Sequence, residues 1–166
     1  MDARDPRVVV MGVSGSGKTS IGLLLAARLG VPFIDADDLH SAEAKATMAA
    51  GTPLIDQDRW PWLGRVADAI AGSAASVTAC SALKRSYRDD LRAGAPDLQF
   101  VELDVPREVL AERMTRRPGH FMPASLLDSQ LATLEPLESD EPGVRVDASG
   151  SEEDIVTGIL FALKAV

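Results

Sequence analysis

The segment Gly12-Val13-Ser14-Gly15-Ser16-Gly17-Lys18-Thr19 restricts the possible folds more than any other feature of the chain. It fits the pattern G-x-x-x-x-G-K-[ST] in full, after an apolar run and before an apolar stripe at helical spacing. In such a loop, glycines let backbone N–H groups point inward at phosphate oxygens, and the next helix directs its positive end at the same charge. We therefore expect these eight residues to bind ATP, with Lys18 as a catalytic residue at the β- and γ-phosphates and Thr19 as a Mg²⁺ ligand.

The rest of the chain alternates short apolar runs with longer stretches of helical spacing. Strand-like runs cover residues 7–11, 31–35, 76–80, 98–104 and 143–147, and helices are expected after the loop, at 42–50, after Pro61, at 85–93, at 107–116 and from Ser151. This alternation predicts an α/β protein with a three-layer α/β/α P-loop NTPase fold, a five-stranded parallel sheet and a mobile lid. We expect a single domain over residues 1–166, with ligands at the carboxyl ends of the strands.

Composition narrows the choice of partner. The net charge of −8 argues against nucleic acid, and no apolar run approaches the about 18 residues of a membrane span. The start of the chain lacks the pattern of a signal peptide, and its one cysteine, Cys80, suits a reducing cytoplasm. Capture of a small anionic substrate by such an acidic chain needs a local cluster of positive groups.

Two carboxylates end the second predicted strand. Asp35 and Asp37 are two residues apart, so in an extended segment they share a face. Asp35, nearer the phosphate loop, is expected to hold the metal through water, and Asp37 to accept the proton of the acceptor hydroxyl. The alternative is an acidic turn that only caps a helix.

Candidate partners for the anions follow later in the chain. Arg113 and Arg117 are four apart on a predicted helix, and they precede a segment with Pro118, Gly119 and Pro123 that has the composition of a mobile lid, about 114–124. We expect both arginines to bind the nucleotide and Arg117 to neutralise charge in the transition state. The alternative is a solvated helix face.

Three further basic residues are candidates for binding a substrate carboxylate. Lys84 and Arg88 follow the third predicted strand, four residues apart, and Arg59 lies beside Trp60 and Trp62. Each is equally compatible with a solvated surface position. The two tryptophans are expected to be packing anchors rather than sugar platforms.

Taken together, the motifs resemble the gluconokinases of the nucleoside-monophosphate- and shikimate-kinase-like group. The matching stretches are Met11–Thr19, Asp35-Ala-Asp37-Asp-Leu-His40, Gly51-Thr-Pro-Leu-Ile-Asp-Gln-Asp-Arg-Trp-Pro-Trp-Leu63, Cys80-Ser-Ala-Leu-Lys-Arg-Ser-Tyr-Arg-Asp89 and Gly119-His-Phe121. The resemblance implies ATP-dependent phosphorylation of D-gluconate to 6-phospho-D-gluconate, feeding the pentose phosphate or Entner–Doudoroff route, and often a homodimer. It also implies that Asp37 with His40 faces the acceptor, that Lys84 and Arg88 line the sugar-acid pocket, and that Arg113 and Arg117 belong to the lid. Arg59 and His120 complete the expected substrate-binding residues.

One stretch departs from the family pattern. After His40 the family usually has an Asn and a Lys where this chain has Ala44 and Thr47, although Lys45 can partly replace the charge. The alternatives are therefore a kinase for another small sugar acid or a shikimate-like acceptor, and a regulatory module that has lost catalysis. Shikimate kinases would show a glycine triplet where this chain has Cys80-Ser81-Ala82, and a module without catalysis would show a damaged phosphate loop.

Overall fold

The computed structural model describes residues 6–116 and 124–164. Its described residues form one five-stranded sheet in the order β2-β3-β1-β4-β5, and every neighbouring pair is parallel. The predicted parallel sheet is therefore confirmed. The strands are β1 (Arg7–Met11), β2 (Phe33–Asp35), β3 (Ser76–Ala79), β4 (Gln99–Asp104) and β5 (Gly143–Asp147).

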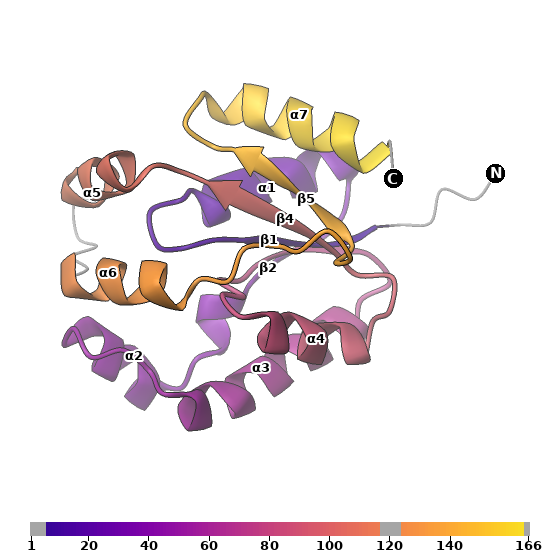
Figure 1. The fold of residues 1–166 in the computed structure, drawn as a ribbon. Helices are drawn as coiled ribbons and strands as arrows, with labels where there is room; N and C mark the ends of the chain where they lie inside the picture. The colour runs from indigo at the N-terminus through magenta and orange to yellow at the C-terminus, as the bar shows by residue number, and fades with distance from the viewer. Residues whose placement is uncertain (1–5, 117–123, 165–166) are drawn as a thin grey trace.

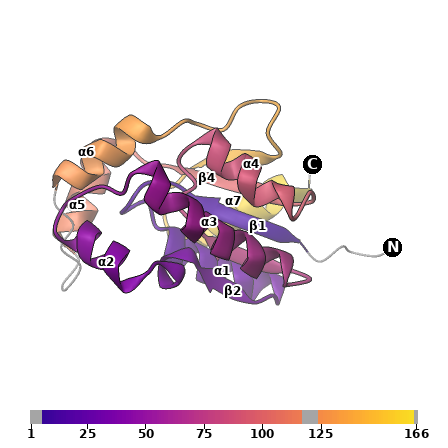
Figure 2. The same cartoon turned by 90° about the horizontal axis from the view of Figure 1, so that it is seen from below.

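Helices cover both faces of the sheet, which gives the three expected layers (Figure 1). Helices α1 and α7 lie on one face, while α3 and α4 lie on the other, with α2 and α6 toward the end where the strands terminate (Figure 2). None of the described helices is both long and apolar enough to cross a membrane. The helices are α1 (Lys18–Leu29), α2 (Ala42–Ala49), α3 (Asp56–Ala71), α4 (Arg85–Ala93), α5 (Arg107–Thr115), α6 (Ala124–Thr133) and α7 (Glu152–Lys164), with a 3₁₀ turn η1 (Ala36–Leu39).

The alternation of side chains along the central strand divides the core in two. Val8 and Val10 of β1 belong to the cluster that includes apolar side chains of α1 and α7. Val9 and Met11 belong to the cluster on the α3 and α4 side, which also contains Cys80. Burial raises the pKa of the Cys80 thiol to about 12, as befits the predicted core position. Because β1 is buried on both faces, the loop that follows it starts from a fixed point.

Two helices differ from the sequence-based expectation. Helix α3 begins at Asp56 and contains Pro61, so the prediction that it follows Pro61 is wrong. Proline removes only the bond to the Gln57 carbonyl, close to the helix start, and the Asp58 side chain accepts a hydrogen bond from the Ile55 N–H. Helix α6 was not expected at all, because it follows the proline-bounded segment interpreted as a lid.

Candidate active site

The phosphate loop joins the central strand β1 to helix α1. Gly17 precedes α1 with a φ of 96°, a conformation that favours glycine. A Cβ atom on Gly12 would approach the Ser16 hydroxyl oxygen to 2.8 Å, so the loop needs glycine there as well. The Lys18 ammonium crosses the loop and donates to the Val13 carbonyl at 3.0 Å. The sequence motif thus takes the tight shape that its glycines predicted.

Two observations fit this loop to a phosphate group. The first turn of α1 contains no acidic side chain, so the positive end of the helix dipole is not offset locally. The Ser16 hydroxyl oxygen is buried and has no hydrogen-bond partner among the described residues. A buried donor of this kind at a helix start suits a phosphate oxygen. The loop residues therefore fit a bound phosphate group, as ATP would supply.

Asp35 and Thr19 meet beside the loop. The Thr19 hydroxyl donates to Asp35 Oδ2 at 3.4 Å, and Asp35 Oδ1 accepts the Asp37 backbone N–H at 3.0 Å. Burial raises the pKa of Asp35, and the neighbouring carboxylates of Asp37 and Asp38 add to the effect. A divalent cation would stabilise the charged form of Asp35, and both groups offer the hard oxygen atoms that Mg²⁺ prefers. The pair predicted as metal ligands therefore has chemistry that fits Mg²⁺.

Asp37 lies in the η1 turn rather than in an extended strand. Helix α3 contacts both ends of this turn: the Trp62 indole donates to the Ala36 carbonyl at 2.7 Å, and Arg65 Nε donates to the Leu39 carbonyl at 2.8 Å. Asp35 therefore does cap a turn, as the alternative interpretation held, while Asp37 itself lines a cavity beside the phosphate loop.

His40 follows the turn and packs flat against Trp62. The two rings stack with centroids 4.1 Å apart and an interplanar angle of 11°. Burial lowers the pKa of His40, and the cations Arg65, Lys45 and Arg59 add to this while the Asp37 carboxylate opposes it. The imidazole is thereby kept neutral near pH 7, able to donate one hydrogen bond and accept another.

A cavity of about 380 Å³ extends from the phosphate loop to helix α2. It brings together Ser14 and Lys18 of the loop and α1, the acidic turn, and two basic side chains, with apolar residues between them. This acceptor cavity is lined by Ser14, Lys18, Asp37, Asp38, His40, Lys45, Met48, Ala49, Pro53, Leu54, Arg59, Trp62, Ser81, Leu83, Leu126, Ser129 and Gln130. The cavity therefore places three kinds of group around one space: cations that can bind an anion, a carboxylate that can accept a hydroxyl proton, and part of the phosphate loop.

The predicted basic residues divide at this cavity. Arg59 lines it, and its guanidinium donates to the Tyr87 hydroxyl at 2.9 Å and lies 3.7 Å from Asp56 Oδ1. Lys84 does not line it, since its ammonium lies 3.3 Å from both carboxylate oxygens of Asp56. The Tyr87 hydroxyl donates to the same carboxylate, and this bond, with the Lys84 ammonium, lowers the pKa of Asp56. The Asp56 carboxylate therefore holds Lys84 beside the cavity.

Arg88 requires a correction. Its side chain is fully buried and forms a two-point ion pair with Glu141, at 2.7 and 2.9 Å. Its remaining terminal nitrogen donates to the Ala82 carbonyl at 2.9 Å. With its donors committed to protein groups, and with no place in the cavity lining, Arg88 is not placed to bind a substrate carboxylate.

The departure from the family pattern lies away from the acceptor cavity. Ala44 and Thr47 line a separate groove between α2 and α3, and the Thr47 hydroxyl donates to the Glu43 carbonyl. Lys45 and Met48, on the other side of α2, line the acceptor cavity instead. Lys45, which can partly replace the charge of the usual lysine, therefore lies at the predicted acceptor site.

A second cavity, of about 500 Å³, lies on the other side of the phosphate loop. It is lined by residues of the loop, of α5 and of the segment between β5 and α7, including Arg113 and Arg116. Arg113 donates to the carbonyls of Gly15 and Ala148, at 3.2 and 2.8 Å. Arg113 therefore lies against the phosphate loop and lines this second cavity.

Two of the predicted site residues, Arg117 and His120, lie outside the described residues, as does most of the predicted lid. One residue of the acceptor cavity was not predicted from the sequence. Gln130 of α6 was not predicted, yet its side-chain oxygen accepts the Ser14 N–H at 2.7 Å and it lines the acceptor cavity. No local signal marks Gln130, because the same helix also contains the polar residues Asp128 and Ser129.

Comparison with known proteins agrees with this geometry. A family model described as an AAA domain matches residues 8–137. A gluconokinase of Gluconobacter oxydans is 51% identical over 163 residues, covering 95% of this chain and 91% of that protein. The thermosensitive gluconokinase of Escherichia coli is 49% identical over 144 residues, covering 84% and 77% respectively.

Solved structures give the same result. The crystal structure of a gluconokinase from Sinorhizobium meliloti matches with a TM-score of 0.91 and 48% identity, covering 99% of this chain and 94% of that one. A shikimate kinase from Aquifex aeolicus matches with a TM-score of 0.62 at 19% identity over 96% of each chain, which indicates the shared fold alone. The protein belongs to the gluconokinase family of P-loop kinases.

Proposed function

We propose that this protein transfers the γ-phosphoryl group of ATP to the 6-hydroxyl group of D-gluconate, giving ADP and 6-phospho-D-gluconate. The observation that carries the proposal is the acceptor cavity, in which Lys18 of the phosphate-loop motif, Asp37, and the cations Arg59 and Lys45 face one space. A polyhydroxy acid has the hydroxyl group and the carboxylate that such a lining would bind. The relatives named gluconokinase support this choice of acceptor.

The residues divide the chemistry as follows. The oxygen of the acceptor hydroxyl forms a bond to the γ-phosphorus while the bond from that phosphorus to the ADP oxygen breaks, and Asp37 accepts the hydroxyl proton. Lys18 and the backbone N–H groups of the loop stabilise the charge on the transferred group. Mg²⁺, when bound at Thr19 and Asp35, supplies further neutralisation of phosphate charge. Positioning and charge neutralisation dominate this kind of reaction.

The experiment is a coupled assay of ADP release across a panel of acceptors. Gluconate should be phosphorylated and neutral glucose should not, because only gluconate has a carboxylate that can pair with Arg59 and Lys45 of the cavity. Shikimate and other sugar acids complete the panel. A folded Lys18→Ala variant should lose orders of magnitude in kcat/KM and serves as the inactive control.

Two outcomes would contradict the proposal. Equal rates on glucose and gluconate would exclude a carboxylate-binding cavity, and a clearly better sugar acid would replace gluconate as the substrate.

Three further properties stay predictions from the sequence: the use of Mg²⁺, a cytoplasmic location and assembly as a homodimer. Omission of Mg²⁺ from the assay and measurement of the mass in solution test the first and the last.

A further inference from the structure

The turn at residues 81–83 links three parts of the molecule through consecutive backbone carbonyls. The Ser81 carbonyl accepts the N–H of Gly12, the first residue of the phosphate loop, at 3.3 Å. The Ala82 carbonyl accepts from Arg88 Nη1 of helix α4 at 2.9 Å. The Leu83 carbonyl accepts from the N–H of Glu135, just after helix α6, at 2.7 Å. Ser81 and Leu83 both line the acceptor cavity, so the shape of this turn is part of the cavity wall.

The middle residue of the turn has a strained backbone. Ala82 has a φ of 44°, and among the described residues it is the one non-glycine residue with a positive φ. Its side chain is fully buried. A left-handed conformation is unfavourable for alanine and accessible to glycine, so it persists only where surrounding contacts hold it. The carbonyl of this residue is the group that Arg88 binds.

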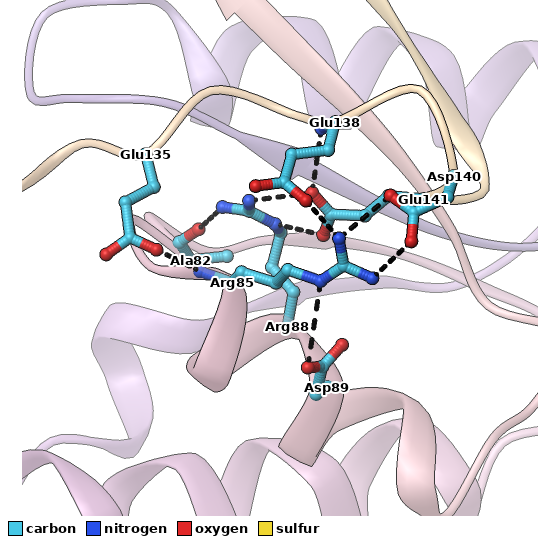
Figure 3. Close-up of polar contacts among 8 residues, drawn as sticks. All are labelled: Ala82, Arg85, Arg88, Asp89, Glu135, Glu138, Asp140 and Glu141. Carbon is cyan, nitrogen blue, oxygen red and sulfur yellow. Dashed lines mark hydrogen bonds and ion pairs between the residues drawn. The ribbon is translucent and has the colours of Figure 1, made fainter.

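Arg88 is held in turn by an acid from a distant part of the chain. Glu141 lies in the loop between α6 and β5, and both of its carboxylate oxygens accept hydrogen bonds from Arg88, at 2.7 and 2.9 Å (Figure 3). Both side chains of the pair are at most 2% exposed. Although burial acts in the opposite direction, the hydrogen bonds from Arg88 and the Glu138 N–H lower the pKa of Glu141, which keeps the acid ionised.

We propose that Arg88 and Glu141 are positioning residues for phosphoryl transfer: the buried pair holds Ala82 in its left-handed conformation and so shapes the acceptor cavity. Neither residue of the pair lines the acceptor cavity, so the pair acts through the turn at 81–83. The pair thereby stabilises at position 82 a backbone conformation that a glycine would adopt without such contacts. The proposal rests on the proposed phosphorylation of gluconate for its assay, and its variants are compared with the wild-type protein.

The first test separates positioning from stability. The double variant Arg88→Met/Glu141→Leu removes both charges, and such replacements of buried ion pairs are often neutral or stabilising. We expect a folded protein whose kcat/KM for gluconate is about 10- to 100-fold lower, because small misplacements at a site have effects of this order. The KM for ATP should change much less. A folded double variant with wild-type kcat/KM for gluconate would show that the pair only stabilises the fold.

A rescue variant tests the mechanism itself. Adding Ala82→Gly to the double variant supplies a residue that adopts the left-handed conformation without the arginine. Part of the lost kcat/KM for gluconate should return, while the melting temperature need not rise. If no activity returns, the conformation of Ala82 is not what the pair controls, and the proposal is wrong.

A conservative variant covers the case in which the double variant does not fold. Arg88→Lys keeps a positive charge opposite Glu141, but one ammonium cannot reproduce the planar two-point contact and also reach the Ala82 carbonyl. It should fold, as judged by circular dichroism, and still lose gluconate efficiency. Wild-type efficiency in folded Arg88→Lys would overturn the proposal.

Arg85 provides the matched control. It lies on the same helix and pairs with Glu138 and Asp140 of the same acidic loop, but it does not contact Ala82 (Figure 3). Arg85→Met should leave kcat/KM for gluconate nearly unchanged. A loss as large as that of the double variant would assign the effect to loop anchoring instead. If the wild-type protein does not use gluconate, the proposed function fails, and the same comparison is made with whichever acceptor it phosphorylates.

Discussion

The indole N–H of Trp62 donates a 2.7 Å hydrogen bond to the carbonyl oxygen of Ala36, the residue before Asp37. The same ring stacks on the imidazole of His40. One buried side chain of α3 therefore contacts both flanks of the turn that carries the expected base. Since α3 also carries Arg59, a single helix supports the turn that carries Asp37 and supplies a cation to the acceptor cavity.

The first prediction concerns this contact. Trp62→Phe keeps an aromatic ring but removes the N–H donor, leaving the carbonyl of the fully buried Ala36 without it. The free energy of unfolding should fall by about 1–3 kcal/mol, the usual range for an unsatisfied buried polar group. The kcat for gluconate should fall as well, because Asp37 loses part of its support, and the KM for ATP should be almost unchanged. Urea denaturation and steady-state kinetics measure the two effects.

Trp60 is the control for that substitution. It is 41% exposed and meets Tyr87 edge-on, away from the acidic turn. Trp60→Phe should change neither kcat nor stability much. If Trp62→Phe loses stability but keeps its full kcat, Trp62 is a packing anchor and does not position Asp37.

The features that the sequence predicted well are those fixed by neighbouring residues. The bounds of β1 and β5 agree with the prediction residue for residue, because each is a short run of apolar and β-branched residues between loop residues. The phosphate loop is equally local: its glycines, its lysine and the following helix lie within one segment. Pro61 misled the prediction of α3, since proline is common in a first turn but is tolerated slightly later.

The misplaced site residue depended on a distant partner. Arg88 was predicted to bind substrate because a basic residue after a strand end resembles a ligand-binding group. Its actual partner, Glu141, lies in the acid-rich loop between α6 and β5, far from Arg88 in the sequence. Nothing local distinguishes Glu141 from the neighbouring Glu138 and Asp140, which are exposed and pair with Arg85. A pairing across this distance in the chain is decided by packing.

The second prediction concerns pH. Because burial lowers the pKa of His40 below its ordinary value of 6.5, the unfolded chain takes up a proton there that the folded protein does not. The contribution of His40 to stability should therefore be fully present above about pH 6.5 and decrease as the pH falls toward the folded-state pKa. Comparison with His40→Gln isolates the effect, since the other groups titrate in both proteins.

The free energy of unfolding of both proteins is measured from about pH 5 to about pH 8, the range in which histidine ordinarily titrates. The difference in the free energy of unfolding between wild type and His40→Gln should be constant above the ordinary histidine pKa. Below that pKa, the wild type should lose stability relative to His40→Gln. A difference that does not change with pH would contradict the lowered pKa of His40.

The last prediction assigns separate roles to Asp35 and Asp37. Asp35 contacts the Thr19 hydroxyl and caps the turn, whereas Asp37 lines the acceptor cavity with Lys18. Asp37→Asn keeps the size of the side chain but removes the proton acceptor, so it should lower kcat strongly and change ATP affinity little. Asp35→Asn removes a hard oxygen ligand, so it should raise the Mg²⁺ concentration needed for half-maximal rate. Separate titrations of Mg²⁺ and gluconate distinguish the two variants, and a normal kcat in Asp37→Asn beside an inactive Asp35→Asn would reverse the assignment.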